Sequence, residues 1–309
     1  MWIGMIALAL VFFPALGRKP LKQWRGALFA HRGYYGNGRA ENTLEAFEAA
    51  CQLGVGIEMD VRLSADGELV VFHDETLLRM AGDPRAVCEV PLEELRALCL
   101  MGGEGRIPTL AEALAVVRGR VPLLIEVKRC RGWRYLCAGV AEALREYGGV
   151  YLLESFDPRA VRILKHRCEN APCGLLVAQP QKDRFHILAR LLAAVYNGLL
   201  CRHMICADFI ARDLRLPNMR WRLPTAVWTV RDAEACAAAL ARGDMAIFEG
   251  FRPLQHQIEA QPHRAAQQHD EYGVGMLEAK QRQRPNDQRG VDPVDIAQRG
   301  SRAAKRRHA

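Results

Sequence analysis

Short apolar runs alternate with helical stretches from residue 26 to residue 248, and this alternation limits the fold more than any other feature of the sequence. Eight apolar runs have the length and composition of strands: 27–30, 56–63, 122–127, 150–156, 174–178, 205–209, 226–230 and 245–248. The main helical stretches are 42–53, 91–98, 109–117, 135–147, 158–166, 184–200 and 232–242. Repeated alternation is typical of a parallel α/β fold, and eight strands favour a closed TIM-like (β/α)8 barrel over an open sheet.

The first long helix carries a signal at its start. Asn42 directly precedes the helical pattern, and Glu45 follows three residues later, as in a variant of the capping box. We therefore expect Asn42 to be the N-cap of this helix.

The stretch from Gly56 to Asp74 concentrates chemically active side chains in one local motif. Glu58 and Asp60 are two residues apart on a strand, so they project from the same side about 7 Å apart and could share one cation. Asp66 and Gly67 form a strong turn signal, and residues 68–72 form the returning arm of a hairpin. The hairpin brings His73 back beside the two carboxylates.

Two further strand ends carry residues that suit a phosphoester enzyme. His31 and Arg32 follow the first strand, while Glu126 and Lys128 share one face at the end of strand 122–127. Catalytic groups of such barrels gather at the carboxyl ends of the strands. Three carboxylates suit a hard cation such as Mg²⁺ or Ca²⁺, two histidines suit general acid–base catalysis, and cationic side chains suit phosphate oxygens.

The chain resembles the glycerophosphodiester phosphodiesterase family over residues 27–253. The resemblance rests on a set of motifs in fixed order: AHRG, ENTLEAF, GIEMDVRLSADGELVVFHDETLLR, IPTLAEAL, LLIEVK, SFD and VWTVRD. It implies a TIM-like barrel and the hydrolysis of glycerophosphodiesters to glycerol 3-phosphate and an alcohol. It also implies a bound divalent metal ion, Mg²⁺ or Ca²⁺.

Site roles follow from this resemblance position by position. His31 and His73 resemble the catalytic acid–base pair, and the metal ligands are expected to be Glu58, Asp60 and Glu126. The expected substrate-binding residues are Arg32, Lys128, Glu41 and Trp228. The charge of Glu41 could instead favour the start of its helix, Trp228 could belong to the core, and we expect Phe156 in the core.

Two positions depart from the family pattern. Ala40 stands where the family usually has a proline before ENT, which should loosen the loop. The last strand continues into IFEGFRP, residues 247–253, instead of the usual Thr-Asp-x-Pro motif, which alters the rim of the pocket.

Two other functions remain open. A lysophospholipase D acting on membrane lysophospholipids would keep the site and change the substrate. A non-catalytic, membrane-tethered binding barrel would belong to a different class, but the complete set of histidines and carboxylates argues against it.

The segments outside the barrel are of a different kind. Residues 2–16 are uncharged and apolar, and Arg18, Lys19, Lys22 and Arg25 follow them. We expect residues 1–25 to form an uncleaved membrane anchor and its basic flank, with the catalytic domain, residues 26–253, facing the cytoplasm. A cleaved signal peptide, and hence secretion, and a buried helix are the alternatives. Residues 254–309 are rich in Gln, Arg and His, and we expect a disordered tail.

Charge and cysteine content limit the partners further. The net charge of +8 arises partly from these two terminal segments, and no basic–aromatic pattern of a nucleic-acid module appears, so we expect no nucleic-acid partner. Ten cysteines without a CxxC pair suggest reduced core thiols, which favours the cytoplasm. The sequence does not indicate an oligomeric state.

Overall fold

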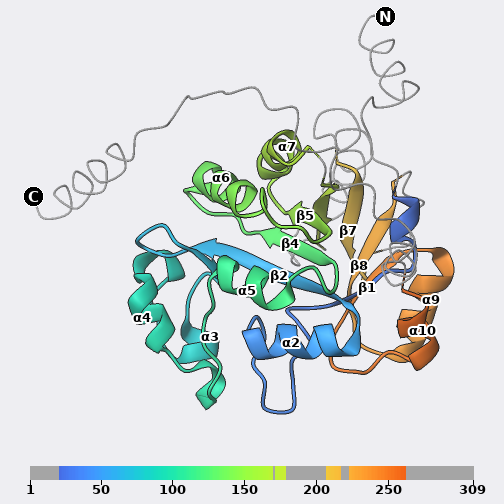
Figure 1. Ribbon diagram of the computed structural model, residues 1–309, viewed down its shortest axis with the longest axis horizontal. Coiled ribbons are helices and arrows are strands. Elements are labelled where there is room, and N and C mark those ends of the chain that lie inside the picture. Colours follow the sequence, from blue (N-terminus) through green and yellow to red (C-terminus); the bar gives the residue numbers. More distant parts are fainter. Residues whose placement is uncertain (1–20, 170, 179–206, 217–222, 262–309) are drawn as a thin grey trace, which may run out of the picture. The chain divides into compact units, whose positions relative to one another are not determined.

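Eight parallel strands close into a barrel in the computed structural model, which describes residues 21–169, 171–178, 207–216 and 223–261 (Figure 1). They are β1 (Leu28–Ala30), β2 (Gly56–Leu63), β4 (Leu123–Val127), β5 (Tyr151–Ser155), β6 (Cys173–Val177), β7 (Phe209–Asp213), β8 (Thr225–Val230) and β9 (Met245–Phe248). The strands are paired in the order β1-β9-β8-β7-β6-β5-β4-β2, and a β1–β2 pairing closes the ring. The TIM-like barrel predicted from the alternation is therefore confirmed.

The predicted hairpin is also present. Strand β3 (Leu69–Val71) pairs antiparallel with the end of β2, with Val61 opposite Val71. After β3, residues 73–107 form a small lobe with its own apolar cluster, which includes Phe72, Leu77 and Leu95. This lobe carries α3 (Leu78–Ala81), α4 (Leu92–Ala97) and the short 3₁₀ helices η2 (Val87–Glu89) and η3 (Leu100–Gly102).

The other helices lie on the outside of the barrel (Figure 1). They are α2 (Leu44–Leu53), α5 (Leu110–Val117), α6 (Trp133–Ala143), α7 (Pro158–Arg167), α9 (Ala233–Arg242) and α10 (Gln255–Glu259). Side-chain oxygens of Thr43, Thr109, Asp157 and Asp232 cap four of them by accepting backbone N–H groups. The predicted cap at Asn42 is wrong by one residue, because the Asn42 amide is bonded to Asp60 instead.

The interior of the barrel is packed rather than hollow. One apolar cluster draws its members from seven barrel strands and includes Phe29, Leu124, Leu152, Phe209 and Ile247. Because side chains alternate along a strand, the remaining buried residues of these strands face the helices and form a second, larger cluster with them. Alternation thus builds two layers of core from one set of strands.

The segment just before β1 belongs to the barrel. Helix η1 (Lys22–Trp24) buries Trp24 in the interior cluster, with its ring 6.1 Å from that of Phe29. Leu21 is buried in the same cluster. The predicted start of the catalytic domain at residue 26 is therefore too late, because an indole is needed to cover the apolar end of the interior.

The predicted boundary after Pro253 is too early for a similar reason. Helix α10 buries Ile258, and the Oε1 atom of the buried Gln261 accepts a hydrogen bond of 2.7 Å from the Leu28 N–H. Residues 254–261 thus satisfy a backbone donor at the start of β1. The rest of the predicted tail, residues 262–309, lies outside the described residues.

One strand prediction is shifted along the chain. Residues 205–209 are predicted as a strand, but β7 begins at Phe209. The preceding Asp208 instead uses its carboxylate to accept the N–H of Cys173 and to pair with Lys165. The predicted helix 184–200 and the apolar run 2–16 lie outside the described residues, and none of the helices that the structure describes has the length and apolarity to cross a bilayer.

The cysteines only partly follow their prediction. Of the eight described cysteines, four are buried: Cys137, Cys168, Cys173 and Cys236. Cys88 and Cys99 are exposed, both in the lobe that follows β3. A core role therefore fits the first four and not the last two.

Gly174 on β6 leaves room for a large side chain on the neighbouring strand. It pairs with Phe209 of β7, and a Cβ atom at position 174 would lie only 2.2 Å from that ring. Gly174→Ala should therefore lower the free energy of unfolding by about 1–3 kcal/mol, measured by urea denaturation. The matched control is Gly148→Ala, because a Cβ atom there meets nothing within 4 Å. The loss should shrink in a Phe209→Leu background, and an equal loss in both backgrounds would contradict the steric explanation.

Candidate active site

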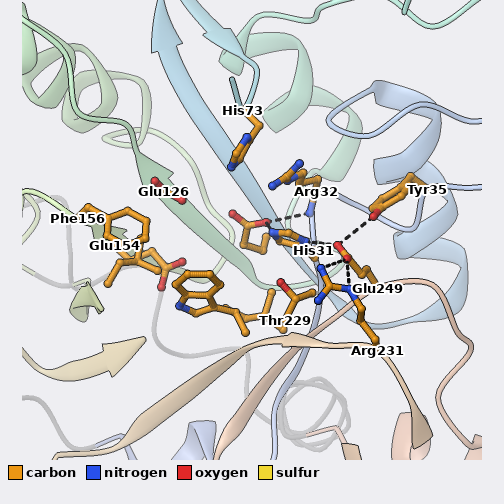
Figure 2. A pocket seen from close by; sticks show the side chains of 14 residues that line it. His31, Arg32, Tyr35, His73, Glu126, Glu154, Phe156, Thr229, Arg231 and Glu249 are labelled. Carbon is orange, nitrogen blue, oxygen red and sulfur yellow. Dashed lines mark hydrogen bonds and ion pairs between the residues drawn. The ribbon is translucent and has the colours of Figure 1, made fainter. Parts of the chain in front are cut away.

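The site is the last layer of the barrel interior. On β4 and β5 the inward rows that begin with Leu124 and Leu152 continue through Glu126 and Glu154, so the apolar interior changes to charged groups at the carboxyl ends of the strands. A cavity of about 380 Å³ opens there (Figure 2). It is lined by His31, Arg32, Tyr35, Glu58, His73, Glu126, Glu154, Phe156, Leu176, Trp228, Thr229, Arg231, Ile247 and Glu249.

Three buried carboxylates meet at one side of this cavity. Glu58, Asp60 and Glu126 each offer an oxygen within 4.8 Å of the other two. Glu58 and Asp60 are two residues apart on β2, and the β2–β4 register, in which Asp60 is opposite Glu126, brings the third carboxylate beside them. An all-oxygen donor set of this charge fits a hard divalent cation. The three predicted metal ligands are therefore adjacent, as such a site requires.

Lys128 lies among these carboxylates. Its Nζ atom is 2.7 Å from Asp60 Oδ1 and 2.8 Å from Glu126 Oε2. Burial alone would raise the pKa of Asp60, but the charges of Lys128, His73 and Arg32 outweigh it and hold this pKa well below its usual range. Burial and the other carboxylates raise the pKa of Glu58. Lys128 is thus a counter-charge behind the cavity and is not among the residues that line it.

Asn42 fixes the central carboxylate. Its Nδ2 donates to Asp60 Oδ2 at 2.7 Å, and its Oδ1 accepts the Asp60 N–H at 3.3 Å. The residue adopts a φ of 56°, a left-handed conformation that asparagine tolerates better than most residues. The sequence signal that suggested a helix cap therefore belongs to a residue that orients a predicted metal ligand.

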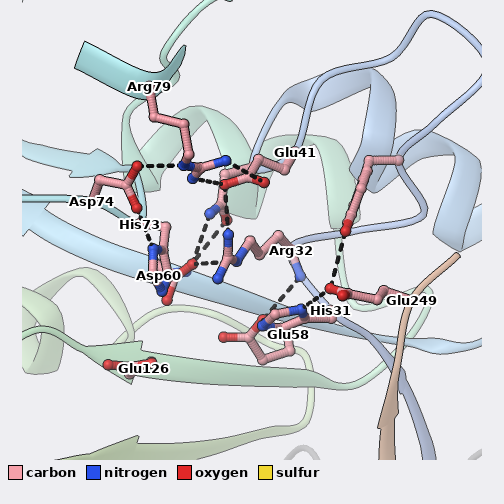
Figure 3. A network of polar contacts seen from close by, with 12 residues as sticks. His31, Arg32, Glu41, Glu58, Asp60, His73, Asp74, Arg79, Glu126 and Glu249 are labelled. Carbon is pink, nitrogen blue, oxygen red and sulfur yellow. Dashed lines mark hydrogen bonds and ion pairs between the residues drawn. The ribbon is translucent and has the colours of Figure 1, made fainter. Parts of the chain in front are cut away.

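His31 is held by a carboxylate from the far end of the chain. Its Nδ1 lies 2.5 Å from Glu249 Oε2, while its Nε2 lies 3.9 Å from Glu58 Oε2 (Figure 3). Tyr35 donates to the same Glu249 oxygen at 3.0 Å, and Arg231 pairs with the other oxygen. Burial opposes ionisation of Glu249, but these donors outweigh it and lower its pKa to about 2.

The segment that departs from the family pattern thus supplies a part-buried partner for a predicted catalytic histidine. The sequence did not reveal Glu249 as a partner of His31, because the two residues are 218 positions apart. The available signal for a site residue was its position directly after the last strand.

His73 is held in a similar way by its neighbour in the chain. Its Nδ1 lies 2.6 Å from Asp74 Oδ1, and the other Asp74 oxygen accepts from Arg79 at 2.5 Å. Arg79 in turn pairs with Glu41, which pairs with Arg32 at 2.7 Å. Burial, the largest influence, lowers the pKa of His73. A continuous chain of charges therefore joins His73 to Arg32 (Figure 3).

Arg32 is the predicted substrate-binding cation that reaches the cavity. Its backbone N–H donates to Glu58 Oε2 at 2.9 Å, and its guanidinium lies 3.7 Å from Asp60. Burial opposes its charge, but Asp60, Glu41 and Glu58 outweigh burial and raise its pKa. Glu41 contacts two arginines and does not line the cavity, so it is placed to orient Arg32.

The other half of the cavity is apolar and aromatic. Trp228 lines it, and its ring meets that of Phe156 edge to face at a centroid distance of 5.9 Å. The prediction that Phe156 belongs to the core is wrong, because its side chain is 41% exposed and lines the same cavity. Glu154 stands beside it at an exposure of 2%, a residue that inward alternation on β5 could have revealed.

Fold and site together define the class of protein: a barrel hydrolase of phosphoric diesters. Two histidines, Arg32 and the carboxylates of Glu58 and Glu126 line one cavity at the carboxyl end of a parallel barrel, and the buried Asp60 converges with these two carboxylates. A family model described as "Glycerophosphoryl diester phosphodiesterase family" matches residues 31–250. The chain belongs to this family.

Individual relatives agree with this assignment. A glycerophosphodiester phosphodiesterase from Caldanaerobacter subterraneus subsp. tengcongensis is 34% identical over 180 residues, which are 54% of this chain and 72% of the relative. The mouse glycerophosphodiester phosphodiesterase 1 is 30% identical over 142 residues, 40% of this chain and 43% of the relative.

Solved structures agree at the level of the fold. A glycerophosphodiester phosphodiesterase from Agrobacterium tumefaciens superposes with a TM-score of 0.55 at 26% identity, covering 72% of this chain and 95% of that one. An Oleispira antarctica phosphodiesterase in complex with sn-glycerol-3-phosphate superposes with a TM-score of 0.61 at 24% identity, covering 76% and 97%.

The ionised state of Glu249 should make a measurable contribution to stability. Its pKa in the folded protein, about 2, lies below the ordinary 4.5, so its contribution is present above pH 4.5 and is lost as the pH falls toward 2. Glu249→Gln should remove this contribution, so the melting temperature of the variant should fall less steeply than that of the wild type across this window. Exposed Glu146→Gln is the control, and identical pH profiles for wild type and Glu249→Gln would refute the assignment.

Proposed function

We propose that this protein hydrolyses glycerophosphodiesters to glycerol 3-phosphate and an alcohol, with a divalent metal ion and a pair of histidines. One observation carries the proposal: His31, His73, Glu58 and Glu126 line a single cavity at the carboxyl end of the barrel, and the buried Asp60 converges with the two glutamates. The names of the relatives supply the substrate class.

The metal ion would be held by Glu58, Asp60 and Glu126, whose oxygens converge and whose charge a divalent cation would balance. When bound, such an ion neutralises phosphate charge and lowers the pKa of a coordinated hydroxyl group. Mg²⁺ and Ca²⁺ both suit an all-oxygen donor set, and the proposal includes either.

His31 and His73 would move the protons. The carboxylates of Glu249 and Asp74 accept at Nδ1 of the two rings, which leaves each Nε2 available for proton exchange with a reacting oxygen. One histidine would take a proton from the attacking water or glycerol hydroxyl, and the other would give one to the leaving alcohol. The two supporting carboxylates stabilise the charged form of whichever ring gains a proton.

Arg32 would stabilise charge on the phosphoryl oxygens, since it lines the cavity and keeps its charge. Glu41 would hold this guanidinium in position. Lys128 is bound between Asp60 and Glu126, so we assign it to balancing the metal-binding carboxylates rather than to direct phosphate contact.

The two other functions have less support. The comparisons favour neither a lysophospholipase D nor a non-catalytic barrel, and the hydrogen-bonded state of both part-buried histidine–carboxylate pairs is hard to reconcile with loss of catalysis. Membrane attachment through residues 2–16 remains a proposal from the sequence.

Replacing either histidine should abolish most of the turnover. His31→Ala and His73→Ala should each lower the rate of glycerol 3-phosphate release by about 10²–10⁴-fold, the usual contribution of a positioned acid or base. Both variants should still fold and unfold cooperatively, since both rings line the cavity and belong to none of the apolar clusters of the described residues. His166→Ala, an exposed residue of α7, is the matched control. Wild-type turnover in either site variant would contradict the proposed roles.

A chelator should inactivate the enzyme, and Mg²⁺ or Ca²⁺ should restore it. Independently of turnover, a bound ion should raise the melting temperature, because a ligand at a hundredfold excess over its dissociation constant adds ~2.7 kcal/mol to stability. Glu126→Gln should weaken this stabilisation. Activity that is unaffected by the chelator, together with no thermal shift, would rule out the metal site.

The same assay can identify the substrate. Glycerophosphodiesters should release glycerol 3-phosphate, whereas a lysophospholipase D would release lysophosphatidic acid from lysophospholipids. Preferential lysophosphatidic acid release would favour the alternative function.

A further inference from the structure

We propose that the aromatic half of the cavity binds a cationic ammonium head group, and that Glu154, Phe156 and Trp228 make the enzyme selective for diesters that carry one. The inference rests on the proposed function, because it concerns the alcohol arm of the same substrate. It assigns a role to a buried carboxylate that neither the acid–base pair nor the metal site uses.

The described lining of the cavity divides into two chemically different sides. One side carries polar groups, among them Tyr35, Arg231 and Glu249, which suit an arm rich in hydroxyl groups. The other side carries Glu154 and the two aromatic residues Phe156 and Trp228, whose rings are in contact. In Figure 2, Glu154 and Phe156 lie away from Tyr35 and Glu249. The two arms of a glycerophosphodiester could therefore occupy different surroundings.

Glu154 is unusual among the acidic residues of this site. It is 2% exposed, and its Oε2 atom has no hydrogen-bond partner among the described residues, although its strand position directs it into the cavity. It is not part of the group of Glu58, Asp60 and Glu126 whose oxygens converge. A buried carboxyl group without a partner is costly, which suggests that a ligand completes its contacts.

The aromatic rings beside Glu154 indicate what kind of ligand this is. Phe156 and Trp228 meet edge to face at an interplanar angle of 86°, so their surfaces form a corner and not a flat stack. Aromatic faces attract ammonium groups, and quaternary ammonium ligands are typically bound by aromatic side chains. Burial and the neighbouring Glu126 raise the pKa of Glu154, and a cationic ligand in this corner would supply the opposite charge that its carboxyl group lacks.

A hydroxyl-rich group fits this side less well. Hydroxyl groups need several donors and acceptors, whereas the described lining near Glu154 offers Phe156, Trp228 and Leu176 of the neighbouring strand β6, with Glu126 opposite on β4. A trimethylammonium group needs no donor and buries its methyl groups against such a lining.

The test compares two diesters that differ only in the charge of the alcohol. The ratio of kcat/KM for glycerophosphocholine to that for glycerophosphoglycerol is measured in the wild type, Glu154→Gln and Phe156→Leu. The Gln variant should lower this ratio roughly tenfold, and the Leu variant roughly threefold, the range expected for desolvated charge and cation–π contacts. Glu142→Gln on the outer face of α6 is the matched control, and its ratio should equal that of the wild type.

A second measurement does not depend on turnover of a charged substrate. Tetramethylammonium should compete with glycerophosphoglycerol in the wild type and lose this inhibition in Glu154→Gln. Phe156 is partly exposed, so Phe156→Leu keeps the proposal testable if the Gln variant does not fold.

Each other outcome overturns the proposal. An equal loss on both diesters in Glu154→Gln would assign Glu154 to the metal site or to the fold, and an unchanged ratio in both site variants would remove the head-group contact. Wild-type activity on neither diester would instead refute the proposed function itself.

Discussion

Three carboxylates buried within reach of one another are the constraint on which the rest of the site depends. Each of Glu58, Asp60 and Glu126 is removed from water, and mutual repulsion adds to a desolvation cost of several kcal/mol for each ion. The structure offsets this cost with the Lys128 ammonium between two of them, with the Arg32 guanidinium beside Asp60, and with the amide of Asn42 on the same carboxylate. These groups lie at the ends of β1 and β4 and at the start of α2. The acidic cluster is therefore stable only when all of these elements have folded.

The same alternation of side chains that packs the barrel also delivers the site. Along β4, Leu124 fills the interior and Glu126 and Lys128 continue the row; along β5, Leu152 is followed by Glu154 and Phe156. The charged groups of the site therefore form one more layer of an otherwise apolar barrel interior, and the packed layers below restrict their movement. The two histidines lie just beyond the strand ends, and each is held in place by a carboxylate.

What the sequence predicted correctly was local or periodic. The eight strands follow from apolar runs, and Glu58 and Asp60 follow from their two-residue spacing on one strand. What it missed depends on contacts between distant segments: the link from Glu249 to His31, and the bond from Asn42 to Asp60, which outweighs a local capping preference. The ends of the domain were misplaced because Trp24 and Gln261 have unremarkable sequence neighbours, and only the closed barrel gives them partners.

The bond between Gln261 and Leu28 has a consequence for the synthesis of the chain. The first strand, β1, is bordered by β9, and its first N–H group is satisfied by a side chain 233 residues later. During translation the edge of β1 that pairs with β9 therefore stays unpaired until almost the whole barrel has left the ribosome. An unpaired strand edge can form hydrogen bonds with other chains. The segment that completes the barrel, from β9 to Gln261, also brings Glu249 to His31, so the enzyme gains its protected edge and a complete acid–base pair in the same late step.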